Sequence, residues 1–210
     1  MRISVCGRLL LASVVAAAFS SVLAQAQNAP LKSSALLDVA LTYAGERAQI
    51  APGTCGCFWL QGGGADAALT LWEGLGASAT VTGAHASNYS SGVDVNKIAY
   101  MFGPRYTFAG WSLGTREQRR LQVFGEALFG GVHAFSGAFP TSTGLTASAN
   151  SFAMQAGGGV NLVLSRKIGL RLFQADYVRT DLPNSYSKSQ NDVRLAVGVN
   201  YRFGSAHRRY

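Results

Sequence analysis

The strongest constraint in this sequence is a period-two alternation of apolar and polar residues in long segments. From Asp192 to Phe203 the odd positions are Val, Leu, Val, Val, Tyr and Phe, and the even positions are Asp, Arg, Ala, Gly, Asn and Arg. Successive side chains of a β-strand point to opposite faces, so this segment predicts a strand with one wholly apolar face. Such a face has to be covered by a second sheet or by lipid.

Seven further segments carry the alternation, although it is weak in 77–85. In 168–180 it blurs at Gln174-Ala175-Asp176, which predicts a β-bulge. We expect strands of about 10–14 residues, whereas strands in soluble proteins average about 5–6 and tilted membrane strands need about 9–11. Besides 77–85 and 168–180, the segments that carry the alternation are 37–46, 66–72, 97–108, 120–129 and 152–164.

The connections between these segments predict an up-and-down arrangement with two rims and with both termini at the periplasmic one. An all-β, eight-stranded antiparallel transmembrane β-barrel is therefore expected, with ten strands if 135–150 contains a hairpin. A soluble exported β-sandwich is the alternative fold. The connections expected at the extracellular rim are 49–60, 86–94, 134–150 and 181–190, and those at the periplasmic rim are 74–76, 109–119 and 165–167.

Residues 1–26 have the pattern of a secretory signal peptide. Arg2 and Arg8 form a basic start, an apolar stretch follows, and Ala24-Gln25-Ala26 supplies small residues for cleavage. No later segment has 18 uninterrupted apolar residues, which excludes a helical membrane protein. The barrel domain is therefore expected to occupy 27–210.

The composition narrows the class of protein further. Only 13% of the residues are charged, which excludes a disordered chain, and the 25 glycines show no collagen period. The formal charge is +8, but export and the absence of a recognition motif argue against a nucleic-acid partner. Strands are expected over about 35–203, followed by a short tail, 204–210.

Several segments resemble the small outer-membrane β-barrel family of Gram-negative bacteria, the OmpA/OmpX-like eight-stranded barrels. The resemblance comes from the order of the segments and covers nearly the whole chain. It implies an outer-membrane protein whose aromatic-ended last strand is read by the barrel-assembly machinery. The tail after Phe203 departs from the pattern, so either the tail is tolerated or Tyr210 serves as the terminal aromatic. The segments are GPRY at 103–106, FGEALFGG at 124–131, GGGV at 157–160, RLFQADY at 171–177 and VNYRF at 199–203.

The polar faces of the expected strands bring charged side chains into the lumen. A barrel of eight strands is just wide enough for its side chains to fill it, and charges there have to be paired or hydrated. We therefore expect an internal ion-pair plug in preference to a narrow ion path. Its expected members are Asp38, Glu126, Asp176 and Asp192 with Lys97, Arg105, Arg171, Arg194 and Arg202.

Cys55 and Cys57 lie in the first expected extracellular loop. Export favours a disulfide, but a bridge across one intervening residue demands an unusual geometry. No histidine or acid accompanies the pair, as a metal site would require. A cross-link or free thiols are the alternatives, and neither a metal nor a cofactor is expected.

The segment His85-Ala86-Ser87-Asn88 resembles the active site of outer-membrane lipid A deacylases, which are also eight-stranded barrels. Those enzymes use a His and a Ser two positions apart, with a carboxylate, and the His activates the Ser. His85 and Ser87 share a strand face, but the nearest downstream acid, Asp94, lies in expected loop sequence. We therefore expect no catalytic residues and a structural or surface-interaction role. A lipid-modifying enzyme and a small pore are the alternatives.

The expected partners are outer-membrane lipids, the assembly machinery and an extracellular ligand held by surface loops, and the protein is expected to be a monomer. His133, next to Phe135, is expected at a rim, and His207 lies in the tail. Basic residues group at the expected periplasmic rim, which matches anionic lipid headgroups. They are Arg116, Arg119, Arg120, Arg166, Lys167, Arg208 and Arg209.

Overall fold

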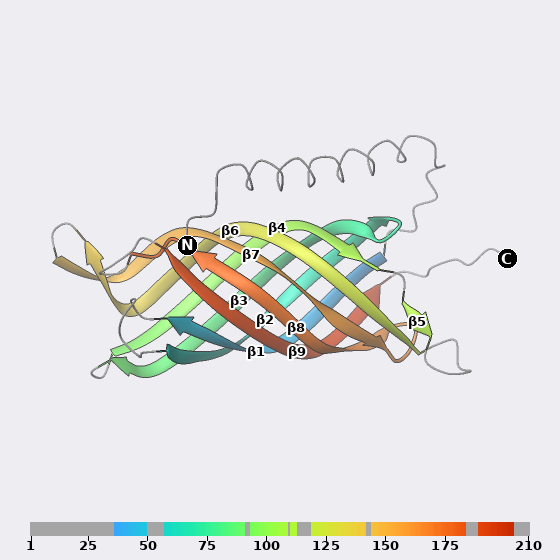
Figure 1. Ribbon diagram of the computed structural model, residues 1–210, viewed down its shortest axis with the longest axis horizontal. Helices are drawn as coiled ribbons and strands as arrows, with labels where there is room; N and C mark the ends of the chain where they lie inside the picture. The colour runs from blue at the N-terminus through green and yellow to red at the C-terminus, as the bar shows by residue number, and fades with distance from the viewer. Residues whose placement is uncertain are drawn as a thin grey trace, which may run out of the picture. The chain divides into compact units, whose positions relative to one another are not determined.

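The computed structural model describes residues 36–49, 57–90, 93–108, 110–112, 119–141, 144–183 and 189–203. These residues form antiparallel strands and short turns (Figure 1). No helix among them is long and apolar enough to cross a membrane. The strands are β1 (Leu36–Gln49), β2 (Cys57–Trp72), β3 (Leu75–Ser90), β4 (Val93–Thr107), β5 (Trp111–Ser112), β6 (Arg120–Thr141), β7 (Gly144–Val163), β8 (Ile168–Thr180) and β9 (Gln190–Phe203).

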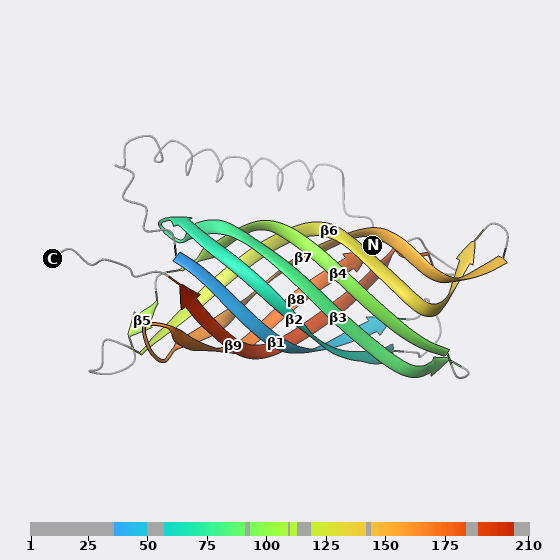
Figure 2. The same cartoon turned by 180° about the vertical axis from the view of Figure 1, so that it is seen from behind.

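Eight of these strands form a closed barrel, which Figures 1 and 2 show from opposite sides. Neighbours in the chain pair with each other, β4 pairs with β6, and β1 pairs with β9. The short β5 pairs only with the start of β6. Because the wall closes on itself, its backbone hydrogen bonds are satisfied without a free edge. The predicted eight-stranded up-and-down barrel is confirmed, and the alternative β-sandwich is wrong.

The connection expected at 134–150 is wrong, and so is the alternative of ten strands. β6 and β7 continue through this stretch as one long hairpin that pairs Phe139 with Thr146 and Thr141 with Gly144. The connection expected at 86–94 is also mostly strand, because β3 runs to Ser90 and β4 starts at Val93. Strand sequences alternate in hydrophobicity only where one face is apolar. Both stretches are rich in small polar residues, so no alternation revealed them.

The strands of the barrel are consequently longer than predicted, from 13 residues in β8 to 22 in β6. We call the end of the barrel where β1 begins and β9 ends the terminal end. The opposite end, beyond which the outer part of the β6–β7 hairpin projects (Figure 1, left), is the hairpin end. At the terminal end the chain turns at 73–74 and 164–167, close to the predicted positions.

β8 contains the predicted bulge, slightly earlier than expected. Leu172 and Phe173 both face outward, and the register with β9 shifts between Arg171 and Gln174. The extra residue keeps Arg171, Gln174 and Asp176 all buried on the lumen side. The blurred alternation in the sequence therefore reflects a change of phase within a continuous strand.

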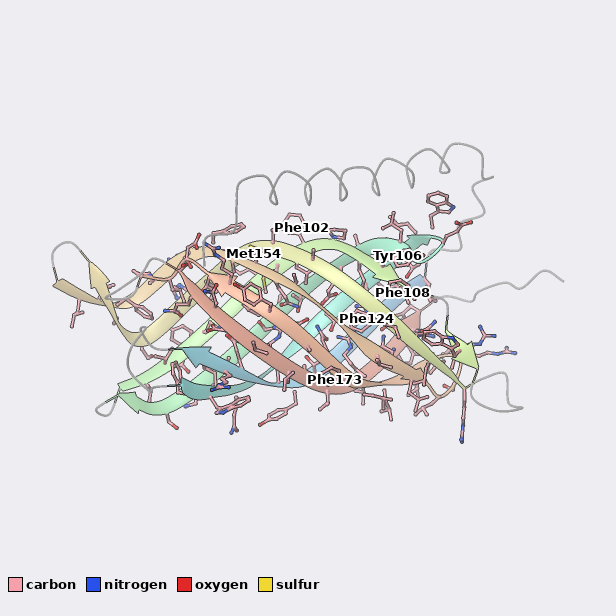
Figure 3. The ribbon with its side chains drawn as sticks, in the orientation of Figure 1. Phe102, Tyr106, Phe108, Phe124, Met154 and Phe173 are labelled. Carbon is pink, nitrogen blue, oxygen red and sulfur yellow. The ribbon has the colours of Figure 1, made fainter. Side chains whose placement is uncertain are left out.

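The apolar faces of the strands point away from the barrel axis. Leu41, Phe102 and Val197 are 62%, 71% and 50% exposed, and Phe102 projects from the wall in Figure 3. The polar faces point inward, where side chains such as Arg171 and Asp192 are almost completely buried. This is the reverse of a soluble protein, in which large apolar side chains are mostly inside.

Candidate functional site: the lumen network

The charged residues of the polar faces converge in the lumen, as predicted. Every member of the expected plug is buried or nearly so. The expected set lacked Glu46 and Asp66, which are also buried there. Both lie at positions that the alternation assigns to polar faces, so the signal for them was present in the sequence.

The first cluster of the network centres on Arg171. Its guanidinium binds both carboxylate oxygens of Asp66, with 3.1 Å from Nη2 to Oδ1. Its Nε donates to Asn161 Oδ1 at 3.3 Å, and its Nη1 donates to Gln174 Oε1 at 2.8 Å. Two-point contacts between Arg and a carboxylate have a defined geometry and are among the stronger polar interactions. Arg171 thus joins β8 to β2, across the lumen.

An aromatic ring supports the same cluster from one side. The guanidinium of Arg105 lies 3.7 Å from the centroid of the Phe124 ring, and that of Arg171 lies 4.9 Å from it. Arg105 also pairs with Asp66 at 3.4 Å and with Glu126 at 3.7 Å. Stacking on an aromatic face stabilises a cation, so Phe124, labelled in Figure 3, is part of the network although it is apolar.

The second cluster centres on Asp176 and two glutamines. Arg194 donates to Asp176 Oδ2 from Nη2 at 3.0 Å and to Gln155 Oε1 at 2.8 Å. Gln174 Nε2 donates to Asp176 at 3.0 Å and to Glu126 at 3.1 Å. The glutamines therefore connect the charged residues, which explains how this much buried charge is accommodated.

Two smaller groups lie nearer the two ends of the lumen. Lys97 contacts Glu46 and lies 3.4 Å from Asp192 Oδ2. At the terminal end Arg202 Nε donates to Asp38 Oδ2 at 3.0 Å, and Arg202 also contacts Gln122. Each expected cation of the plug therefore has a carboxylate partner.

Toward the hairpin end, apolar clusters line the lumen beside the group of Lys97. One cluster consists of Ala48, Leu60 and Ala86, with Phe58 and Val95 packed against it. A larger cluster comes from β4, β6, β7 and the residues after β8. Its buried members are Ala99, Met101, Leu128, Val132, Ala134, Phe139, Ala153 and Leu182.

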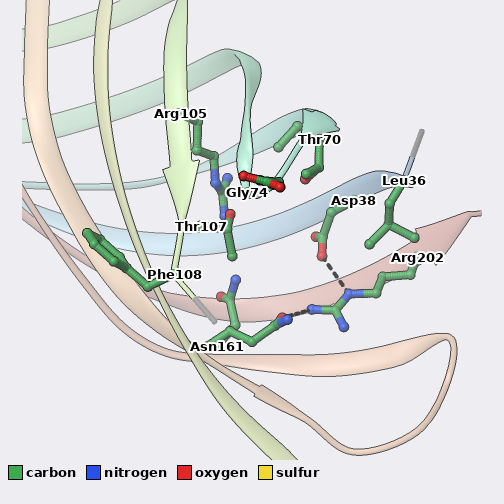
Figure 4. A pocket seen from close by; sticks show the side chains of 12 residues that line it. Leu36, Asp38, Thr70, Gly74, Arg105, Thr107, Phe108, Asn161 and Arg202 are labelled. Atoms are coloured by element: carbon green, nitrogen blue, oxygen red, sulfur yellow. Dashed lines mark hydrogen bonds and ion pairs between the residues drawn. The ribbon is translucent and has the colours of Figure 1, made fainter. Parts of the chain in front are cut away.

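A cavity of about 420 Å³ lies at the terminal end of the lumen (Figure 4). Asp38, Thr70, Arg105, Asn161 and Arg202 contribute to its lining. Its deep side reaches Arg105, whose contacts with Asp66 and Glu126 belong to the central network. We therefore describe it as a vestibule that adjoins the central network.

The structure places the deacylase-like residues on the outer face of the wall. His85 Nδ1 lies 2.8 Å from Asn96 Oδ1, so an amide occupies the place where an acid would orient the imidazole. Ser87 and Asp94 are exposed, and no hydrogen bond joins Ser87 to His85 in the described part of the chain. The geometry of an activated serine is therefore not present in this structure.

His85 instead belongs to a series of polar pairs that follows the hairpin-side limit of the outward apolar surface. His133 Nδ1 lies 2.7 Å from Asn150 Oδ1, and the His133 ring stacks on Phe135. Tyr43 donates to Gln61 at 3.1 Å and Tyr177 donates to Asn191 at 2.6 Å. Paired polar and aromatic side chains are typical of the limit of a membrane-facing band.

Several expectations concern residues outside those that the structure describes. The signal peptide, Cys55, Arg116 and the tail with His207, Arg208 and Arg209 are among them, and so is the side chain of Cys57. The expectations about these residues stay predictions. Among the described residues, no group of three or more His, Cys, Asp or Glu side chains is arranged to hold a metal ion.

Solved structures share the fold of this chain at low sequence identity. Ail, the attachment invasion locus protein of Yersinia pestis, solved with the heparin analogue sucrose octasulfate, is 14% identical with a TM-score of 0.53. That match covers 81% of this chain and 99% of Ail. Neisserial surface protein A is 15% identical with a TM-score of 0.53, over 80% of this chain and 97% of that chain.

No protein-family model matches the sequence, and no curated protein is similar to it. The fold is therefore identified from the closed circuit of strands, the outward apolar faces and the two structural matches. This chain has the fold of the small eight-stranded β-barrels of the bacterial outer membrane.

Proposed function

We propose that this chain is an integral outer-membrane protein that neither conducts nor catalyses, and that it acts through the surface it presents outside the cell. The observation that carries the proposal is the inverted distribution of side chains, with apolar residues around the outer wall and paired charges inside. An apolar outer surface of this extent is stable in lipid and not in water.

In this proposal the terminal end faces the periplasm and the hairpin end faces the exterior. The signal peptide at 1–26 would export the chain, and the assembly machinery would insert it with Phe203 or Tyr210 as the terminal aromatic. The protein would function as a monomer whose closed wall itself leaves no strand edge for a second copy.

The filled lumen supports a non-conducting barrel. Buried ion pairs and apolar clusters both lie inside the barrel, and a passing ion would have to displace them. Opening a path would separate buried pairs such as Arg171 with Asp66, which costs about 3–5 kcal/mol for each pair broken.

The outer part of the β6–β7 hairpin supports a role in surface interaction. In the described part of the chain β4 pairs with β6 only up to Phe135, and β8 pairs with β7 only from Ala153. Beyond these residues β6 and β7 pair only with each other, and we call this part, residues 136–141 and 144–152, the ribbon. The ribbon has two backbone edges, and Leu145 near its tip is 74% exposed. An extended segment of another protein can add to such an edge as a further strand.

The chemistry of this ribbon favours an uncharged partner. Residues 135–150 contain no Lys, Arg, Asp or Glu. The ligand in the Ail structure is a sulfated, strongly anionic molecule, and recognition of such a ligand needs cations. We therefore expect this ribbon to bind an uncharged protein segment in preference to a sulfated polysaccharide.

Cysteine labelling on intact cells tests the location and the orientation together. In a Cys55→Ser/Cys57→Ser background, Ser148→Cys in the ribbon and Ser165→Cys in the β7–β8 turn place one thiol at each end of the barrel. A membrane-impermeant maleimide should label the first variant on whole cells and the second only after lysis. Equal labelling of both on intact cells would contradict the orientation.

Two measurements test the absence of conductance and of catalysis. The purified barrel should give no large, stable currents in planar bilayers, and cells that produce it should have unchanged lipid A acylation. Loss of an acyl chain that depends on His85 or Ser87 would establish the enzyme alternative. Large currents would place the protein among the pores.

A further inference from the structure

Basic residues group on one side of the terminal end, where β6 begins and β7 turns into β8, and we call this side the β6–β7–β8 sector. Arg119 and Arg120 lie at the start of β6, and Arg166 and Lys167 lie in the turn between β7 and β8. Arg120 pairs with Val163 in the ladder between β6 and β7, so the turn begins directly beside the start of β6. The four basic residues therefore lie on adjoining elements at one side of the barrel mouth.

The other edges of the barrel differ from this sector. The β2–β3 turn at the terminal end carries the acid Glu73, which is exposed. At the hairpin end Arg179 lies 3.9 Å from Asp181, so its charge is locally balanced. Arg119, Arg166 and Lys167 are exposed. Among the described residues at the ends of the barrel, exposed cations are thus most numerous in the β6–β7–β8 sector.

The cations lie at the depth of lipid headgroups. Leu164 and Ile168 flank the β7–β8 turn and are 38% and 53% exposed on the outward apolar surface. Trp111 of β5 pairs with Leu121 beside the same sector and is 65% exposed. Tryptophan is enriched where a membrane meets water. The basic residues therefore follow directly after the last side chains of the apolar band.

Hydrogen bonds hold the turn that carries Arg166 and Lys167 in a defined conformation. Ser165 Oγ accepts from the backbone N–H of Ile168 at 3.1 Å, and the N–H of Ser165 donates to the Ile168 carbonyl at 3.0 Å. The Lys167 carbonyl accepts from the N–H of Arg202 at 2.7 Å, which ties the turn to β9. The backbone of the turn is thus ordered before binding, so only the two side chains lose conformational freedom on binding.

We propose that this sector binds the phosphate headgroup of an anionic phospholipid in the periplasmic leaflet. This inference goes beyond the proposed function and rests on its membrane location. The exposed Arg119, Arg166 and Lys167 would contact the phosphate, while Trp111 and the apolar residues above it contact the acyl chains. The adjacent apolar band favours a lipid over a soluble phosphate, since only a lipid meets both surfaces.

Tryptophan quenching by brominated lipids tests this site directly. In a Trp59→Phe/Trp72→Phe background, Trp111 is the remaining tryptophan. The folded barrel is placed in phosphatidylcholine nanodiscs that contain a small fraction of either brominated phosphatidylglycerol or brominated phosphatidylcholine. We expect the anionic lipid to reach the same quenching of Trp111 at a mole fraction at least about five times lower than phosphatidylcholine. One basic residue near the surface contributes roughly that factor.

Charge-matched variants separate the site from general attraction to a basic protein. Arg166→Gln/Lys167→Gln should remove most of the preference, whereas Arg47→Gln/Arg179→Gln, which removes two cations near the hairpin end, should leave it unchanged. Equal quenching by both lipids, or an unchanged preference in Arg166→Gln/Lys167→Gln, would overturn the site while the folded barrel persists. A chain that gives no heat-modifiable, folded band in these discs would overturn the membrane-barrel proposal itself.

Discussion

The two halves of the lumen differ in the side chains that line them. Toward the terminal end, Arg171, Asp66 and Arg194 with their partners form directional contacts between strands on different sides of the barrel. Toward the hairpin end, apolar clusters that include Leu128 and Val132 lie beside the charged group of Lys97 with Glu46, and we call this the apolar half. Polar pairs define which strands face each other, whereas apolar packing tolerates exchange of side chains of similar volume. The difference indicates that the first half specifies the arrangement and the second excludes water.

The largest effect is expected in the charged half. Arg171→Ala should lower the free energy of unfolding by about 3–5 kcal/mol, because it leaves Asp66 buried without its main partner. Urea unfolding of the barrel in lipid vesicles measures this change. Arg179→Ala, whose side chain is half exposed in its pair with Asp181, is the matched control and should change stability by less than about 1 kcal/mol. A similar loss in both variants would mean that the network contributes no more than a surface ion pair.

A somewhat smaller effect is expected in the apolar half. Leu128→Ala removes a completely buried side chain and should cost about 2–4 kcal/mol. Leu145→Ala removes the same atoms from a side chain that is 74% exposed in the ribbon, and should be close to neutral. The same unfolding assay compares the two. If both were neutral, the lumen near the hairpin end would be hydrated and not close-packed.

Glu126 lies at the boundary between the halves, two residues before Leu128 on β6. It accepts from Gln174 at 3.1 Å and from Gln155 at 3.4 Å, and pairs with Arg105 at 3.7 Å. Because Arg105 keeps Asp66 as a partner, Glu126→Ala should cost only about 1–3 kcal/mol. Thermal melting in detergent micelles should show a lower midpoint, and planar bilayers should show no large conductance. An unchanged midpoint would contradict the contacts of Glu126 in the lumen.

The smallest expected effect is the interaction free energy between a substitution in one half and a substitution in the other. If the network and the apolar clusters are independent, the double variant Arg171→Ala/Leu128→Ala should lose the sum of the single losses within about 0.5 kcal/mol. The two single variants supply the reference values. A larger departure would show that the two halves form one cooperative unit.

The wall of the barrel could be predicted from the sequence because one physical rule governs it. The outward faces of β4 and β9 are continuous in hydrophobicity, so period two reveals both the strands and the side that meets lipid. The face of most lumen charges followed from the same rule, the exception being Asp176, which lies beyond the bulge. The partner of each charge did not, because the height of a side chain along the axis depends on strand tilt and stagger. Arg171 and Asp66, for example, are 105 positions apart.

The apolar half of the lumen and the long hairpin were not predicted, for a different reason. On β6 the inward positions Phe124, Leu128 and Val132 are as apolar as the outward ones, so alternation does not distinguish the faces there. The ribbon beyond Phe135 is exposed along most of its length and so shows no alternation either. Both features depend on what lies opposite in three dimensions, which a single strand sequence does not contain.

The bulge in β8 has a consequence for how a barrel of this kind can change in length. Deleting one residue from a regular strand of the wall turns every side chain beyond the deletion to the other face. Arg171 pairs with Gly198 and Gln174 pairs with Ala196, so β8 has two residues where β9 has one. Deleting Leu172 or Phe173 therefore has the opposite effect. Losing one of the two restores an unbroken ladder and leaves every other side chain on its present face. Among the described strands, β8 is thus a place where a single-residue deletion is compatible with the barrel, while the regular parts of the wall can change only in steps of two.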